Sequence, residues 1–166
     1  MIRDTPRVVI DTNAWLDLLL FDDPRAMALH RALRDGAVFA VVDGACRDEW
    51  LRVLQYPQLG LDRMRRAALL LAFDTLARPL PADAPQREPV ALPRCRDRDD
   101  QKFLQLAFDA HARWLVSRDR HVLALGRRTV RAGWFEIVAP QDWAPTSGAS
   151  MVAAEAPFRA GSDTRA

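Results

Sequence analysis

The chain has 166 residues, 49% of them hydrophobic and 28% charged, and its 24 basic and 22 acidic side chains give a net charge of +2. This length and composition are typical of one globular domain with a full core, and they exclude an intrinsically disordered chain. The longest apolar run, residues 67–73, is far too short for a membrane-spanning helix. Acids interrupt the first apolar stretch, so no signal peptide is predicted, and we expect a soluble, cytoplasmic protein with no membrane partner. Cys46 and Cys95, with no CxxC pair, are too few for a disulfide framework or a zinc site.

Strands and helices are predicted to alternate along the chain. Short β-branched and aromatic runs predict buried strands at residues 7–10, 37–42, 114–116 and 135–138. Helical periodicity, caps and proline signals predict helices at residues 12–20, 24–35, 45–55, 61–77, 97–111 and 121–125. The five prolines between residues 78 and 93 predict an extended connection with a short strand near Val90.

This alternation predicts a three-layer α/β domain with a mostly parallel central sheet, spanning residues 1–144. Residues 145–166 are rich in small and polar residues, which predicts a flexible tail. In such a domain, ligands bind beyond the carboxyl ends of the strands.

Two acids follow predicted strands directly. Asp11 ends the first apolar run, where an acid has no role in solubility, and Asp119 comes three residues after Val116. The alternative for both is a simple helix cap. Their position at strand ends nevertheless favours a place in the ligand site.

The helix predicted from residue 97 carries three further acids. Its apolar face includes Phe103, Leu104, Ala107, Phe108 and His111. Projected onto the helix, Asp100 falls near the centre of that face, Asp99 falls on the solvent side, and Asp97 stays ambiguous. We therefore expect Asp100 to point inward, although acids at this end also favour the helix dipole.

Glu49 lies at the edge of the apolar stripe formed by Cys46, Trp50 and Val53, whereas its neighbour Asp48 projects to solvent. An acid on a helix edge is usually just a solvated charge. Glu49 is nevertheless a candidate site residue. Its helix follows the second strand, so the α/β topology brings it to the same rim as the other acids.

The site acids predicted in this way are Asp11, Glu49, Asp100 and Asp119. Carboxylates at about 4 to 6 Å repel by roughly 3 to 4 kcal/mol a pair at an effective dielectric near 20, so such a cluster needs a bound cation. All-oxygen ligands suit Mg²⁺ or Mn²⁺, which orient phosphate and activate water.

Basic residues gather towards the end of the domain. Residues 113–131 hold six arginines and one acid, which favours contacts with a phosphate backbone. The candidates for such contacts are Arg118, Arg120, Arg127 and Arg128. The tryptophans at 15, 50, 114 and 134 are predicted to lie in the core or an interface, and no histidine has metal-ligand spacing.

Four segments of the chain together resemble a known family. They are Val8-Val-Ile-Asp-Thr-Asn13, Asp48-Glu-Trp-Leu-Arg-Val-Leu54, Cys95-Arg-Asp-Arg-Asp-Asp-Gln-Lys-Phe-Leu104 and Ser117-Arg-Asp-Arg-His-Val-Leu123. In this order and spacing, between about Arg7 and Trp143, they resemble the motifs of PIN-domain ribonucleases, in particular the toxin components of toxin–antitoxin systems.

The resemblance implies a PIN-like α/β/α fold, a Mg²⁺ or Mn²⁺ cofactor, cleavage of RNA and an antitoxin partner. Carried over to this chain, the catalytic acids are Asp11, Glu49, Asp100 and Asp119, with Asp97 as a possible extra metal ligand. Supporting hydrogen bonds are implied for Thr12, Asn13 and Ser117. Arg118 stands where the family usually has glycine. Which of the three acids at 97, 99 and 100 is the ligand, and whether one or two metals bind, stay open.

We therefore predict a metal-dependent endoribonuclease, the toxin of a toxin–antitoxin pair and a possible homo-oligomer. Two alternatives remain: a DNA or flap nuclease of related architecture, and a non-catalytic RNA- or partner-binding module with the same fold. A phosphatase is disfavoured because residues 11–13 lack the second aspartate of a DxD nucleophile motif.

Overall fold

The structure, a computed structural model, describes residues 5–82, 84 and 86–145. It contains five parallel strands in the order β3-β2-β1-β4-β5. The strands are β1 (Arg7–Ile10), β2 (Phe39–Val42), β3 (Ala77–Pro79), β4 (Trp114–Val116) and β5 (Glu136–Val138). The predicted tail at residues 145–166 lies, apart from Pro145, outside the described residues.

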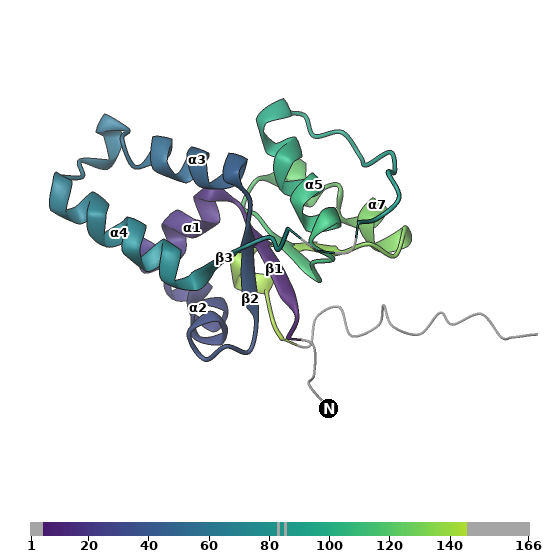
Figure 1. Cartoon of the computed structure of the whole chain (residues 1–166), viewed down its shortest axis with the longest axis horizontal. Coiled ribbons are helices and arrows are strands. Elements are labelled where there is room, and N and C mark those ends of the chain that lie inside the picture. The colour runs from purple at the N-terminus through teal and green to yellow at the C-terminus, as the bar shows by residue number, and fades with distance from the viewer. Residues whose placement is uncertain (1–4, 83, 85, 146–166) are drawn as a thin grey trace, which may run out of the picture.

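Helices cover the sheet on both sides, as Figure 1 shows, with α1 to α4 on one side and α5 and α7 on the other. Their bounds are α1 (Thr12–Leu19), α2 (Met27–Arg34), α3 (Gly44–Val53), α4 (Arg63–Leu76), α5 (Gln101–Asp109), α6 (Arg120–Leu123) and α7 (Gly126–Arg131). Short 3-10 turns lie at Pro24–Ala26, Pro57–Leu59, Arg98–Asp100 and Pro140–Asp142. The predicted three-layer α/β class is confirmed, and the sheet is wholly parallel.

The central strands are apolar because they are buried on both faces. Val8, Val9 and Leu115 are at most 1% exposed, as expected for the middle of a parallel sheet between two helical layers. On the side of α1, α3 and α4, Trp50 stacks on Phe73 at 5.2 Å between ring centroids. This aromatic core fixes α3 and α4 relative to the sheet, and it confirms that Trp50 is a core residue.

The strand predicted near Val90 is wrong. Among the described residues between 80 and 97 none is in a strand, and the extra strand is instead β3, where the sequence predicts a helix end. β3 pairs only with β2, at the sheet edge, and an edge strand tolerates Pro79 because its missing N–H is not needed there.

Two helical predictions also need correction. Helix α5 ends at Asp109, so His111 is exposed with φ of 50° and does not belong to the apolar face. Helix α7 was not predicted, because its apolar periodicity is weak. It forms by packing on β5, where Gly126 lies so close to Ile137 that a Cβ would stand 3.4 Å from the Ile137 carbonyl oxygen.

Candidate functional site

The carboxyl ends of β1 and β4 lie side by side and carry Asp11 and Ser117. Ile10 pairs with Val116, and the Asp11 amide donates to the Val116 carbonyl at 3.0 Å. Adjacent parallel strands therefore place the residues that follow them next to each other. Both side chains are buried, Ser117 completely.

Asp11 is held by two hydrogen bonds. Its carboxylate caps α1 by accepting from the Ala14 amide at 2.7 Å, and it also accepts from the Ser117 hydroxyl. Burial raises its pKa to about 6, against the lowering effect of these bonds, and the negative charge of Asp100 raises it further. Asp11 therefore does cap α1, as the alternative interpretation predicts. This bond does not offset the cost of burying the negative charge of its carboxylate.

Ser117 links Asp11 to Asp119. Its hydroxyl oxygen accepts from the Asp119 amide at 3.0 Å while the hydroxyl donates to Asp11. Asp119 in turn caps α6 by accepting from the His121 amide at 2.6 Å. The loop after β4 is thereby fixed with both acids at one rim of the sheet.

Asp100 faces this rim from the start of α5. It is half-buried, whereas Asp97 and Asp99 are exposed. Desolvation raises the pKa of Asp100, and the nearby negative charges of Asp97, Asp119 and Glu49 raise it further, in that order, against an opposing effect of Lys102. Residues 98–100 form a 3-10 turn and not the first turn of an α-helix, yet Asp100 is the most buried of the three acids.

Glu49 reaches the site from α3, where two donors hold it. The Thr12 hydroxyl donates to Glu49 Oε1 at 2.6 Å, and the Lys102 ammonium forms an ion pair with Oε2. Asp48, its neighbour, is exposed, as its helical position predicts. Asn13 is exposed at the start of α1.

Asp100 thus lies within electrostatic reach of Asp11, Glu49 and Asp119, while these three carboxylates accept hydrogen bonds from protein donors. Among the described residues, no three His, Cys, Asp or Glu side chains are arranged to hold a metal ion. The donor set nevertheless fits a hard cation, because it offers carboxylate oxygens. Cys95, beside Asp100 and Asp119, has its pKa raised to about 11 by burial and these charges, so it stays a thiol and not a soft thiolate ligand.

A cleft opens beside Asp119. It has a volume of about 540 Å³ and is lined by Arg96, Asp97, Arg98, Asp119 and His121. The Arg96 guanidinium lies 3.1 Å from His121 Nε2, and because guanidinium can only donate, Nε2 is the acceptor. Arg96 and Arg98 are basic residues of the site that the sequence prediction missed, since they precede the arginine-rich stretch.

The predicted phosphate-binding arginines fall in different places. Arg118 pairs with Asp17, with Nε 2.9 Å from the carboxylate, and Asp17 is only 2% exposed. Arg120 and Arg127 are exposed, and Arg128 lines a separate hollow with Arg94. Asp17 was also missed, although an acid between Leu16 and Leu18 in an apolar helix is a signal of a buried ion pair.

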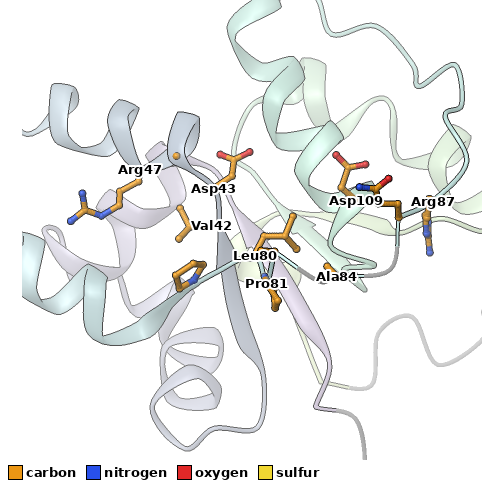
Figure 2. Close-up of a pocket in the computed structure, with 12 residues that line it drawn as sticks. Val42, Asp43, Arg47, Leu80, Pro81, Ala84, Arg87 and Asp109 are labelled. Carbon is orange, nitrogen blue, oxygen red and sulfur yellow. The ribbon is translucent and has the colours of Figure 1, made fainter.

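A larger hollow of about 720 Å³ lies elsewhere, near the ends of β2 and β3. Figure 2 shows Asp43 and Arg47 at one side of it and Asp109 and Arg87 at the other. None of the predicted site acids lines it. Size alone therefore does not identify the functional site, and the carboxylates after β1 and β4, which both interact electrostatically with Asp100, are the stronger candidate.

The fold and the position of these acids agree with one protein family. A PIN domain model matches residues 7–121, which cover most of the described chain and all four acids. The chain belongs to the PIN-domain family. No curated protein matches the chain. PIN domains are generally nucleases and typically use divalent metal ions, and the five-stranded parallel sheet flanked by helices is the PIN fold. In the described part of this PIN domain, no helix is long and apolar enough to cross a membrane.

Proposed function

We propose that this PIN domain is a metal-dependent endoribonuclease that cleaves RNA phosphodiester bonds. The observation that carries the proposal is that carboxylates from separate elements gather around the half-buried Asp100. Burial and the negative charges of Asp97, Asp119 and Glu49 raise the pKa of Asp100. Carboxylates that disfavour one another's charge across separate elements cost stability unless a cation binds among them. This is the arrangement expected of a site built for a cation rather than for the fold.

In this proposal Asp11, Asp100 and Asp119 hold Mg²⁺ or Mn²⁺, and Glu49 and Asp97 are further oxygen donors. When bound, the metal supplies a Lewis acid for the phosphate and lowers the pKa of a coordinated water. Ser117 and Thr12 orient Asp11 and Glu49 through their hydroxyls. Such hydrogen bonds to metal ligands fix their direction and therefore the geometry of the site.

The cleft beside Asp119 supports a nucleic-acid substrate. Arg96 and Arg98 line it together with Asp97 and Asp119, so a phosphate that enters the cleft meets both basic side chains and proposed metal ligands. Arg120, exposed between the cleft residues Asp119 and His121, is a candidate for a contact to a further phosphate, and Arg127 on α7 is an exposed candidate whose contact the RNA-binding test decides.

The test is cleavage by purified protein of labelled single-stranded RNA and of the matching single-stranded and flap DNA. We expect RNA cleavage with Mg²⁺ or Mn²⁺, none in EDTA, and none by Asp100→Asn. Asp99→Asn is the matched control, because Asp99 is the neighbouring residue and its side chain is exposed. This variant should keep its activity. Cleavage of DNA alone would favour the flap-nuclease alternative, and binding without cleavage would favour a non-catalytic module.

We also propose that the protein acts in the cytoplasm as the toxin of a toxin–antitoxin pair. A groove between α1, α2 and α4 supports a protein partner: it is lined by apolar residues, including Leu71, which is 70% exposed. Its edge carries His30, Arg34 and Arg65 against one acid, Asp22, which suits an amphipathic segment with acidic residues.

Co-expression with the product of a neighbouring small reading frame tests the partner. We expect a stable complex and loss of cleavage, and Leu71→Asp should prevent the complex while leaving cleavage intact. Size-exclusion chromatography with light scattering on the free protein measures whether it forms a homo-oligomer. A neighbouring product that neither binds nor inhibits would contradict the toxin role without affecting the nuclease proposal.

A further inference from the structure

The chain contains a single lysine among its 24 basic residues, and that lysine lies in the carboxylate site. Lys102 is on the first turn of α5, and its ammonium forms an ion pair with Glu49 Oε2 on α3. The Lys102 and Glu49 side chains are only 22% and 15% exposed. The other Lys and Arg side chains are all arginines, and the one lysine pairs with a predicted site acid with both side chains largely shielded from solvent.

The chemistry of lysine suits this position. An ammonium is a compact point charge on a flexible stem, whereas guanidinium is a broad planar fork. In size and charge density the ammonium is the closer of the two to a metal cation. Its other bond, from Nζ to the Asp99 carbonyl oxygen at 2.5 Å, keeps it at the start of α5, close enough for its charge to stabilise ionised Asp100.

Glu49 consequently has both oxygens engaged. Thr12 donates to Oε1, and Lys102 takes Oε2. A second cation near Glu49, Arg52, stands 3.8 Å from Oε2 but is 63% exposed, so solvent screens it. Lys102 is therefore the cation whose removal most changes the charge of this site.

We propose that Lys102 is a positioning residue that acts as a resident cation: it holds Glu49 in place without metal and gives way when Mg²⁺ or Mn²⁺ binds. This inference rests on the proposed metal-dependent function. Lys102 thereby weakens metal binding, since metal must displace its ammonium from Glu49 and bind against its positive charge. It also offsets part of the repulsion among the acids in the metal-free protein.

Isothermal titration of Mn²⁺ into metal-free protein, without RNA, tests this role. We expect Lys102→Met to bind Mn²⁺ at least about tenfold more tightly than wild type, because a like charge a few ångströms from the metal is gone. Lys102→Arg keeps the charge and should stay within about threefold of wild type. Arg52→Met is the matched control and should change affinity by less than about twofold.

The single lysine also allows a measurement on the unaltered chain. Protein labelled with ¹³C at lysine Cε gives one lysine signal, from Lys102. Titration with Mg²⁺ should shift this signal, with the midpoint of the binding curve found by calorimetry. Glu49→Gln should move the signal in the absence of metal, since the ion pair is lost.

The outcomes separate this inference from the proposed function. Wild-type protein that takes up no Mn²⁺ would remove the metal-dependent function, and the role of Lys102 with it. Wild type that binds Mn²⁺, with Lys102→Met binding equally or more weakly, would overturn only the resident-cation role. A lysine signal that stays fixed while calorimetry reports binding would overturn it too, whether or not the Met variant folds.

Discussion

At the scale of single residues, Asp11 shows how a buried carboxylate differs from a helix cap on the surface. Asp11 accepts a hydrogen bond from the Ala14 amide, as a helix cap does. A capping carboxylate on the surface, however, stays ionised at little cost in free energy because water solvates it. Asp11 is 6% exposed, and its pKa of about 6 lies above its ordinary value of 3.8. Folding therefore disfavours the ionised form of Asp11, and this sets the sign of its pH dependence.

We predict that Asp11→Asn stabilises the metal-free protein at pH 7.5. A carboxyl whose folded pKa exceeds its unfolded pKa costs nothing below about pH 4, and the cost is complete above the folded value near 6. The gain in unfolding free energy should reach about 3 kcal/mol at pH 7.5 and vanish near pH 4. Urea unfolding in EDTA at both pH values measures it. A variant less stable than wild type at pH 7.5 would make Asp11 a structural cap.

Sequence reasoning at this scale worked where position along a strand or helix decides the outcome. Asp11 follows a buried strand and Asp99 turns to solvent, and both features can be derived from periodicity. The ion pairs between Arg118 and Asp17 and between Lys102 and Glu49 cannot be predicted in this way. They join residues far apart in the chain, and their geometry depends on how the helices pack.

At the scale of elements, the pair of Arg118 and Asp17 fastens α1 to the loop after β4. Asp17 is almost fully buried, so its carboxylate depends on the guanidinium for compensation, although Arg118 itself is 43% exposed. The residue that replaces the usual glycine of this family motif therefore has a structural partner.

We predict that Arg118→Ala lowers the free energy of unfolding by about 1 to 3 kcal/mol, because it leaves a buried carboxylate without its cation. Arg120→Ala, two residues on and exposed, should change it by less than about 0.5 kcal/mol. Urea unfolding at neutral pH compares the two. Unchanged stability together with weaker RNA binding would make Arg118 a phosphate contact and not a structural one.

The strands could be predicted from the sequence where both of their faces are buried. The strands at β1, β2, β4 and β5 are apolar runs in the sequence, because helices cover both faces of the sheet. β3 was missed because its three residues have little apolar pattern and depend on pairing with β2. Helix α7 was missed for the same reason, since its packing on β5 stabilises it more than its own sequence does.

At the scale of the whole molecule, charge is nearly balanced but unevenly distributed. The net charge of +2 cannot draw RNA to the protein from a distance, so binding must come from local basic surfaces. Arg96 and Arg98 line the cleft beside Asp119, and Arg120 is exposed next to Asp119 in the chain, so these arginines provide such a surface.

We predict that RNA binding by inactive Asp100→Asn weakens steeply with salt. Three or four phosphate contacts give a slope of about −2 to −3 in a plot of log affinity against log salt concentration. Arg96→Ala should make the slope shallower by roughly one contact. Fluorescence anisotropy with labelled single-stranded RNA measures both. Affinity that does not depend on salt would contradict recognition through the phosphate backbone.

The proposed nuclease activity requires that the carboxylates after β1 and β4 and at the start of α5 form a metal site. Anomalous diffraction at the manganese absorption edge, from crystals soaked in Mn²⁺, locates the ion directly. We predict a peak within ~2.0 to 2.6 Å of carboxylate oxygens of Asp11, Asp100 and Asp119, with Lys102 moved off Glu49. A manganese ion bound elsewhere, or no peak at a concentration that saturates binding in solution, would contradict it.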